Sequence, residues 1–523
     1  MTEILFPGVF LEEIDAGIIP IEGVSTSTAA FFGETGRGPT RPVLVTSFTD
    51  YRRWFGGDFG TDKFMPYALA GFFENGGRRA WVCRIAGAGA ATASRTIGGL
   101  RIEAVGAGAW GNRVFVKLTD STTRSGPDST PVGFRLQIAC WAQSTPDNRY
   151  PDPFEPDHAP TKPLPIIEEF DDLVWDDPAS PDYFVERIGR AAAIVTVATA
   201  EPDGLAAQPI AGFAPLAGGT DGAAPTVADY NGENLDPDLR TGLAALELGA
   251  YDEVALIAAP GAPDAVVAAI VAHCESNKFR FAVLDVARGQ ANAAALDPRA
   301  KGESAYAAFY YPWIYVAEPE SGARRLVPPS GHVLGLYARS DIERGVWKAP
   351  ANDILRGTLD LEYRIDDATQ ALLNPRGVNA IRQFPALGIR VWGARTLSAN
   401  SLWKYVNVRR LFIFLERSID EGTQWVVFEP NDERLWGRVR DTIRQFLRAQ
   451  WRAGALTGVT EKEAFFIACG PATMTQDDIA NGRLICEIGI APLRPAEFVI
   501  FRIFQNTACA GSVRGMVAPH PRR

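Results

Sequence analysis

The sequence predicts a multidomain α/β protein, and three features of the chain carry this prediction. Its 523 residues exceed what one hydrophobic core usually supports, so the chain should divide into several compact units. From about residue 205, short apolar strands alternate with helices, which is the pattern of a parallel sheet covered on both faces. Between residues 100 and 200 the pattern changes to hairpin strands, which indicates a separate β-rich unit inserted into the α/β core.

The first 25 residues predict an extended arm with one or two short strands. Glycine and proline recur along this segment, and its apolar residues are too few to form a core of their own. The arm therefore suits exchange with another subunit, with Val9, Phe10 and Leu11 as the candidate contact residues.

The segments that follow predict the first part of the α/β core. The stretch TAAFFGETGRGP predicts a strand that ends in a glycine-rich turn. The stretches SFTDYRRWFGG and PYALAGFFENGG predict two amphipathic helices, each closed by glycine. Residues 80–85 predict another buried strand, and the small residues of 86–99 mark a domain boundary.

The inserted unit and the C-terminal part are predicted from the same signals. LRIEAV, RVFVKL and FRLQIACW are predicted strands, whereas residues 146–165 hold seven prolines and predict a long solvent-facing loop. After Pro350 the chain predicts helices in YVNVRRLFIFLERSI and DERLWGRVRDTIRQFLRAQWRAG. It closes with the predicted strands RLICEIGIA and AEFVIFRIF and a polar tail.

Composition excludes several classes of protein. Hydrophobic residues make up 46% and charged residues 22%, which is the balance of a folded globular chain, and the net charge of −10 argues against a nucleic-acid coat. No stretch approaches 18 uninterrupted apolar residues, and the first residues are acidic where a secretory leader would be basic. We therefore expect no membrane insertion and synthesis in the cytoplasm, where the six scattered cysteines would be free thiols.

The sequence contains no recognisable active-site motif, so we predict no catalytic, cofactor-binding or metal site. Residues 106–111 read GAGAWG and match a dinucleotide fingerprint, but an alternating strand follows where the fingerprint requires a helix, so a turn between strands is predicted. The four histidines, His158, His273, His332 and His520, form no metal-spaced cluster, and no nucleophile motif occurs.

The end of the chain predicts a strand that needs partners on both faces. Phe498, Ile500 and Phe504 alternate with further apolar residues, so both faces of this strand are apolar and must be covered. The strand could complete a sheet of its own subunit, or it could be donated to a neighbour by β-augmentation.

The helix at 432–452 predicts an arginine stripe opposite an apolar face. At 100° per residue its apolar side chains share one arc. Five arginines share the other side: Arg434, Arg438, Arg444, Arg448 and Arg452. This side is either an ordinary solvated face or a contact for an acidic partner, whose carboxylates guanidinium groups bind bidentately.

Several stretches, taken in order, resemble the tail sheath family of contractile phages, tailocins and extracellular injection systems. The opening FPGVFLEEI is similar to the family's N-terminal arm, and GAWGNRVFVKL is similar to its strand–turn element. LAGGTDG, at 216–222, resembles the entry to the sheath core. GVNAIRQFPALGIRVWGARTL, YVNVRRLFIFLERSI and WVVFEPNDERLW resemble the C-terminal sheath domain.

The resemblance implies a division of the chain. It places a subtilisin-like α/β core at 26–90 and 200–360, a β-rich outer domain at 91–199, and a tube-facing α+β domain at 361–494. Residues 1–25 and 495–523 become the arms that link neighbouring subunits, with Gly17 and Gly23 as candidate hinges.

The implied function is that of a structural sheath subunit without enzymatic activity. Copies of the chain would stack as hexameric rings around an inner tube protein, bounded by baseplate and cap proteins, and would contract to drive the tube. The particle would leave the cell on lysis. A degenerate subtilisin-like hydrolase and a static surface polymer are the alternatives.

Overall fold

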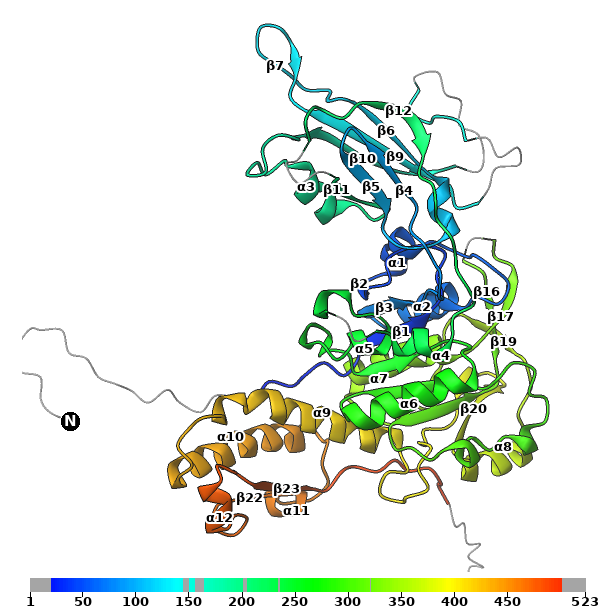
Figure 1. Cartoon of the computed structure of the whole chain (residues 1–523). Coiled ribbons are helices and arrows are strands. Elements are labelled where there is room, and N and C mark those ends of the chain that lie inside the picture. Colours follow the sequence, from blue (N-terminus) through cyan, green and yellow to red (C-terminus); the bar gives the residue numbers. More distant parts are fainter. Residues whose placement is uncertain are drawn as a thin grey trace, which may run out of the picture.

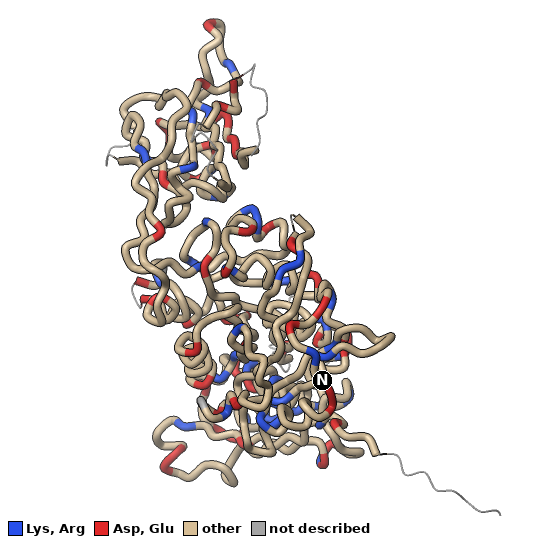
Figure 2. The backbone as a smooth tube through the Cα atoms, turned by 90° about the vertical axis from the view of Figure 1, so that its right-hand side faces the viewer, with Lys and Arg blue, Asp and Glu red and all other residues tan. Residues whose placement is uncertain are grey.

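The computed structural model describes residues 20–143, 150–155, 164–200, 205–233, 236–319 and 321–500. These residues form three parts along one long axis: a β-rich outer domain, a central α/β domain and a largely helical C-terminal domain (Figure 1). Figure 2 shows acidic and basic residues interspersed over the outer lobe and the body below it. Within the described ranges, no helix is both long enough and apolar enough to cross a membrane.

The central domain is built on a nine-stranded sheet whose inner strands run parallel, as predicted. Parallel pairing joins β1 to β3 and to β13, and continues through β14 and β15 to β20. Antiparallel strands close both ends of the sheet. In sheet order the strands are β18 (Asp353–Ile354), β21 (Gly388–Val391), β20 (Val378–Phe384), β15 (Ala307–Tyr311), β14 (Phe281–Asp285), β13 (Leu256–Ala258), β1 (Ala29–Gly33), β3 (Ala80–Arg84) and β2 (Val43–Val45).

Strand β1 shows why the sheet strands are apolar at every position. All five of its residues are buried, and alternate side chains enter two different cores. Ala29 and Phe31 pack on one face of the sheet, and Ala30 and Phe32 pack on the other. The first face is covered by α1 (Phe48–Phe55), α2 (Met65–Glu74) and α7 (Ser330–Arg344), and the second by α4 (Val227–Asn231), α5 (Gly242–Ala245) and α6 (Asp264–Asn277).

The two predicted helices near the N-terminus are confirmed. Helix α1 begins after Ser47, whose side chain accepts a hydrogen bond from the Asp50 amide, and it ends at Gly56 with φ of 83°. Helix α2 is followed by Gly76, which also has a positive φ. Around the sheet lie α8 (Asp367–Leu373) and a small antiparallel sheet of β17 (Arg324–Val327), β16 (Ile314–Ala317) and β19 (Thr358–Leu361).

The outer domain consists of two antiparallel sheets around a separate core. One sheet has the order β10 (Ile166–Leu173), β9 (Phe134–Cys140), β6 (Val114–Asp120) and β12 (Ala211–Pro215). The other has the order β11 (Val195–Thr199), β5 (Leu100–Ala104) and β4 (Ser94–Ile97). Helix α3 (Phe184–Ala191) and a terminal hairpin of β7 (Arg124–Ser125) and β8 (Thr130–Pro131) complete this domain.

The GAGAWG segment is a turn between strands, as predicted. Its last three residues begin a short 3₁₀ helix, Ala109–Arg113, that leads directly into β6. Gly108 has φ of 139°, and a side chain there would meet the Trp110 ring. The glycines therefore serve local backbone geometry, because no α-helix begins here to hold a pyrophosphate.

The expected end of the outer domain, at residue 199, is wrong. Strand β12 pairs with β6 of the outer domain. The segments by which the chain enters and leaves this domain are joined by antiparallel bridges, Ala91–Thr220 and Ser94–Ala217. The outer domain therefore extends to about residue 217. Strand β12 reads AGFAP, whose glycine and proline are weak strand formers, so the local sequence does not reveal it.

The proline-rich segment lies partly outside the described residues, and its described part is anchored. Phe154 contacts Phe213 with 6.2 Å between ring centroids, and Tyr150 contacts Phe115 at 5.0 Å. Lys117 pairs with Asp152 beside these rings. Residues 150–155 therefore pack on the outer sheet through aromatic contacts.

The C-terminal domain packs two long helices on a two-stranded sheet. Its elements are α9 (Val406–Gly422), α10 (Glu433–Arg452), α11 (Glu461–Ala464), β22 (Phe465–Cys469), α12 (Gln476–Ala480) and β23 (Cys486–Ile490). The expected start of this domain, at residue 361, is wrong, because β20 and β21 belong to the central sheet. Their partner strand β15 lies about 70 residues earlier, and a pairing over that distance leaves no local signal.

The predicted strand at the end of the chain is not formed in the described part. Residues 493–500 have no strand assignment, and the remainder of the stretch, including Phe504, lies outside the described residues. Phe498, Val499 and Ile500 are 71%, 66% and 79% exposed. This part of the segment thus leaves the body of the chain with its apolar side chains uncovered.

Candidate assembly surfaces

The carboxyl edge of the parallel sheet is where open α/β folds usually bind ligands. Here aromatic rings of the chain itself cover part of the edge, whereas a cavity of about 380 Å³ lies at the end of β14, lined by Leu284, Asp285 and Val286. Phe64 and Trp313 pack edge to face, with 5.1 Å between ring centroids, and Phe64 lies against Gly261 at the end of β13. The Trp313 indole donates a hydrogen bond to the Val286 carbonyl at 2.7 Å.

A serine–aspartate pair at this edge has the chemistry of a structural clamp. The Ser330 hydroxyl donates to Asp285 at 2.6 Å, and the Ser330 amide donates at 2.8 Å, so the carboxylate holds the start of α7. Burial raises the pKa of Asp285 to about 7 despite hydrogen bonds from Ser330 and Gly261. Ser330 is 0% exposed, so its hydroxyl cannot reach a substrate.

The histidines and the possible metal ligands of the described residues can be located in the structure. In the described part of the chain, no group of three or more histidine, cysteine or acidic side chains could hold a metal ion. His273 lies beside Arg280, with 3.3 Å between ring and guanidinium nitrogens, and His332 packs against Gly71. Burial lowers the pKa of both imidazoles to about 4, so both are neutral at pH 7.

The N-terminal segment is attached to the body at residues 21–28. Ile21 packs into the core of the C-terminal domain, and the Val24 amide donates to the Ser418 hydroxyl at 3.1 Å. Gly23 lies against Phe414, where an added Cβ would sit 3.0 Å from the ring. The structure therefore gives Gly23 a close-packing position, whereas the other hinge candidate, Gly17, lies outside the described residues together with Val9, Phe10 and Leu11.

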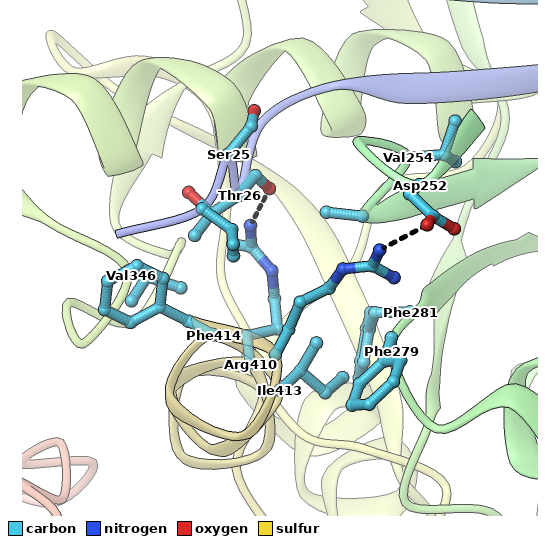
Figure 3. A pocket seen from close by; sticks show the side chains of 13 residues that line it. Ser25, Thr26, Asp252, Val254, Phe279, Phe281, Val346, Arg410, Ile413 and Phe414 are labelled. Carbon is cyan, nitrogen blue, oxygen red and sulfur yellow. Dashed lines mark hydrogen bonds and ion pairs between the residues drawn. The ribbon is translucent and has the colours of Figure 1, made fainter. Parts of the chain in front are cut away.

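A buried ion pair closes this attachment. Arg410 of α9 and Asp341 of α7 are each 3% exposed at the side chain, with 2.9 Å between Nη1 and Oδ1. Arg410 also donates to the Thr26 carbonyl at 2.8 Å, and the Thr26 hydroxyl donates to Asp341 at 2.7 Å. Figure 3 shows the hydrogen bond between Arg410 and Thr26; both residues line a small cavity of about 20 Å³ together with Ile413 and Phe414. One ionic contact thus joins the N-terminal segment, the central domain and the C-terminal domain.

A second ionic contact holds the C-terminal segment. The Glu497 carboxylate accepts a bidentate pair from Arg395, with both N–O distances at 2.7 Å. It also accepts from Asn374 and Tyr405, each at 3.0 Å, and Lys404 lies at 3.3 Å. The segment is therefore fixed on the central domain at Glu497, immediately before the exposed Phe498.

We expect Glu497 to hold the segment into strongly acidic solution. Burial alone would raise the pKa of this carboxyl, but hydrogen bonds from Arg395, Asn374 and Tyr405 and the charge of Arg395 hold the pKa at about 2. A lowered folded pKa stabilises the folded state above the unfolded value of about 4.3, and that stability is lost as the pH falls through the folded value.

Thermal unfolding of Glu497→Gln measures this contribution. We expect the free energy of unfolding of the variant to be about 2 kcal/mol lower than that of the unaltered chain at pH 7 and at pH 5, because a hydrogen-bonded charge is removed. Near pH 2 the two chains should have the same free energy of unfolding. The matched control is Glu487→Gln, since Glu487 is exposed on β23 and should show no difference at any pH. Convergence already near pH 4 would contradict the assignment.

The sheet of the C-terminal domain offers open edges next to these attachments. Strands β22 and β23 pair only with each other among the described residues. Phe466 on its outer face is 59% exposed. Unpaired strand edges are templates for strands of other chains, so this sheet is the candidate acceptor for exchanged segments.

The arginines of the predicted stripe differ in the structure: some pair with acidic residues of the same chain, and others are exposed without such a partner among the described residues. Helix α10 buries its predicted apolar face, which confirms the periodicity. Arg448 pairs with Glu461 at 2.7 Å, and Arg444 lies 3.6 Å from the same carboxylate. Arg438 is exposed and stacks on Trp425 at 4.5 Å. Arg434 and Arg452 are exposed and make no ion pair with any residue that the structure describes.

Exposed apolar residues on the C-terminal domain were not found by sequence reasoning. Phe428 is fully exposed and has a positive φ of 71°, and Val427 beside it is 59% exposed. Val459 is 89% exposed. A run such as WVVFEP looks like an ordinary buried segment in the sequence, so only solvent exposure identifies these residues as candidate contacts.

Uncovered apolar side chains, open strand edges and attached terminal segments are together typical of a subunit that assembles with other chains. Two family models match this chain: the phage tail sheath protein central domain over residues 227–397 and the phage tail sheath C-terminal domain over residues 398–506. The chain belongs to the phage tail sheath family.

Individual relatives agree with this assignment. A protein of Pseudomonas aeruginosa described as a prophage major tail sheath protein is 28% identical over 37% of this chain and 49% of its own length. The tail sheath protein of Burkholderia phage BcepMu is 27% identical over 58% of this chain and 65% of its own length. The matched regions thus span less than two thirds of these relatives.

Among the solved structures similar to this chain, some match nearly its whole length. A chain of the anti-feeding prophage baseplate is 25% identical, with a TM-score of 0.56, covering 96% of this chain and 100% of that one. A chain of an extracellular contractile injection system, the PVC sheath complex in its contracted state, is 23% identical, with a TM-score of 0.58, covering 97% and 99%. The second likeness shows the fold alone.

Proposed function

We propose that this chain is the sheath subunit of a contractile injection system. Copies of it polymerise as a helical sheath around an inner tube and contract to drive the tube into a target. The observation that carries the proposal is the match of the two phage tail sheath family models over residues 227–506. The likeness in fold to a chain of a contractile sheath complex over 97% of this chain supports the same function.

Contraction requires two arrangements of the same subunits joined by links that do not detach. A metastable extended state and a more stable contracted state must differ in their subunit interfaces. In our proposal the links are the terminal segments, 1–25 and 495–523, including Val9, Phe10, Leu11 and Phe504. They leave the body at Ile21 and Glu497 and add strands to the β22–β23 sheet of neighbouring subunits.

The remaining assignments follow from the same proposal. The subunits stack in hexameric rings, with baseplate and cap proteins at the two ends, and assemble in the cytoplasm before the particle is released. The central domain takes a subtilisin-like topology without hydrolytic activity, which the burial of Ser330 supports. The outer and C-terminal domains lie at opposite ends of the molecule's long axis, so the outer domain would face away from the tube (Figure 1).

Helix α10 is the proposed contact with the tube. Of its five candidate arginines, Arg434 and Arg452 are exposed and available to acidic groups of another protein, whereas the exposed Arg438 lies 3.9 Å from Glu429 of the same chain. Arg444 and Arg448 are engaged by Glu461 of the same chain, so their main role would be internal. The tube surface opposite the helix should therefore carry carboxylates.

Reversing the charge of Arg434 and Arg452 should weaken attachment to the tube. We expect the double variant Arg434→Glu with Arg452→Glu to reduce the fraction of tube-filled sheaths at least tenfold and to leave sheath formation intact. The control is Arg78→Glu with Arg364→Glu, which changes the net charge equally at exposed sites on the central domain. Electron microscopy counts both populations, and an unchanged tube-filled fraction would exclude the helix as the contact.

Negative-stain electron microscopy tests the function itself. The chain is expressed alone and together with its tube protein. Narrow tube-filled cylinders and wide hollow cylinders are the expected pair of forms. A cylinder of one width under all conditions would indicate a static polymer, and monomers in both samples would overturn the proposal.

A further inference from the structure

Two cysteines lie directly opposite each other in the C-terminal domain. Cys469 ends β22 and Cys486 begins β23, and the strand register pairs them. Both are free thiols, and they lie within hydrogen-bond reach of each other. They are separated by 17 positions in the sequence, so no short cysteine motif reveals the pair.

The position of the pair within the ladder suits a covalent bond. The Ala491 amide donates to the Ala464 carbonyl at 2.9 Å, so this pair is hydrogen-bonded across the ladder. Hydrogen-bonded and non-hydrogen-bonded pairs alternate in antiparallel sheets, which makes Cys469–Cys486 a non-hydrogen-bonded pair. Cα atoms of such pairs are about 4.5 Å apart, within the range of about 4.4–6.8 Å that disulfides require.

We propose that Cys469 and Cys486 form a cross-strand disulfide when the chain meets a low-molecular-weight disulfide such as oxidised glutathione. The partly exposed Cys486 loses its proton and attacks the oxidant, which forms a mixed disulfide and releases one thiol. The buried Cys469 then loses its proton, attacks the sulfur of Cys486 and releases the second thiol. Two protein thiols are oxidised, and one small disulfide is reduced to two thiols.

The surroundings of the pair make the reaction slow at neutral pH. Burial and the adjacent Cys469 together raise the pKa of Cys486 to about 12, against the opposing charge of Arg440. Burial also raises the pKa of Cys469, against the opposing effects of the Cys486 hydrogen bond and the Arg440 charge. Because the thiolate is the attacking species and its fraction rises about a hundredfold from pH 7 to pH 9 for such a pKa, the disulfide should form up to about a hundredfold faster at pH 9.

The disulfide would close the loop that contains α12 and would hold β22 and β23 in one register. Its consequence for assembly rests on the proposed function, in which these strands accept segments from neighbouring subunits. A sheath made with reduced cysteines would acquire this crosslink after release from a reducing compartment. The acceptor sheet would then be covalently held during contraction.

Peptide mapping tests the disulfide on the intact chain, whether or not it assembles. The reduced chain is incubated with oxidised glutathione at pH 7 and pH 9, alkylated, and digested with trypsin without reduction. Trypsin cleaves after Lys462 and Arg483, so the two cysteines fall on different peptides, 463–483 and 484–502. We expect these peptides to appear joined, to separate on reduction, and to accumulate faster at pH 9.

Two variants sharpen the assignment. Cys509→Ser removes the cysteine nearest the C-terminus and should leave the joined peptides unchanged. Cys469→Ser, or Cys469→Ala if the serine variant does not fold, should abolish them and leave a glutathione adduct on Cys486. Three outcomes with the unaltered chain would each overturn the proposal: separate alkylated peptides at pH 9, a persistent glutathione adduct on Cys486, or a Cys486–Cys509 crosslink. Failure of the proposed function would show in electron microscopy and would leave this result unaffected.

Discussion

Removal of residues 1–20 is expected to give a chain that folds normally and forms no sheath. The cut falls before Ile21, which packs into the C-terminal core, and before Val24 and Thr26, which bond to the body. The described contacts of the segment therefore remain, while the proposed exchange residues Val9, Phe10 and Leu11 are lost. Sedimentation and electron microscopy should show a monodisperse chain where the full-length protein forms cylinders.

A triple substitution tests whether sheath formation depends on the apolar side chains of the arm or only on its length. Val9→Asp, Phe10→Asp and Leu11→Asp keep the arm's length and should prevent cylinders as completely as the deletion, because charged residues cannot cover apolar surface. The thermal unfolding temperature of both variants should equal that of the full-length monomer. Long cylinders formed by the truncated chain would exclude the arm as the link between subunits.

Asp341→Ala should be the most destabilising single substitution at the junction of the domains. It leaves Arg410 buried and without its carboxylate partner, and the loss of one member of a buried pair costs about 3–5 kcal/mol. It also removes the acceptor of the Thr26 hydroxyl. Urea unfolding should detect the loss, and faster hydrogen exchange should occur at residues 24–28.

Two controls test whether the cost comes from the isolated charge. Asp341→Leu combined with Arg410→Met removes both charges and should recover most of the lost stability. Glu186→Ala breaks the exposed pair of Glu186 with Arg190 on α3 and should cost about 0.5 kcal/mol or less. If the double variant is as unstable as Asp341→Ala, the loss of stability comes from altered packing and not from the unpaired buried charge.

The described structure confirms those predictions that depended on local pattern. Apolar runs predicted the buried parallel strands, and β1 is buried at all five positions. The 3.6-residue period predicted the buried face of α10, and the glycine signals placed the end of α1. Each of these patterns is contained within a single element, so neighbouring residues are sufficient to reveal it.

The wrong domain boundaries and the arginines that pair within the chain have a common cause, which is contact between elements that are separate in the sequence. Strands β20 and β21 join the central sheet through β15, and β12 joins the outer sheet through β6, across about 70 and 95 residues. Arg444 and Arg448 are engaged by Glu461, which belongs to another helix. No periodicity within the helix indicates which of its arginines has such a partner.

The sequence by itself determined the fold class, the family resemblance and the polarity of each helix face, because these depend on the order of neighbouring residues. Only the tertiary structure decided which charges are neutralised, where the terminal segments leave the body and which cysteines face each other. Asp341 and Arg410, Glu497 and Arg395, and Cys469 and Cys486 are each brought together by folding. The strength of such a contact depends on distance and burial, which are properties of the folded chain.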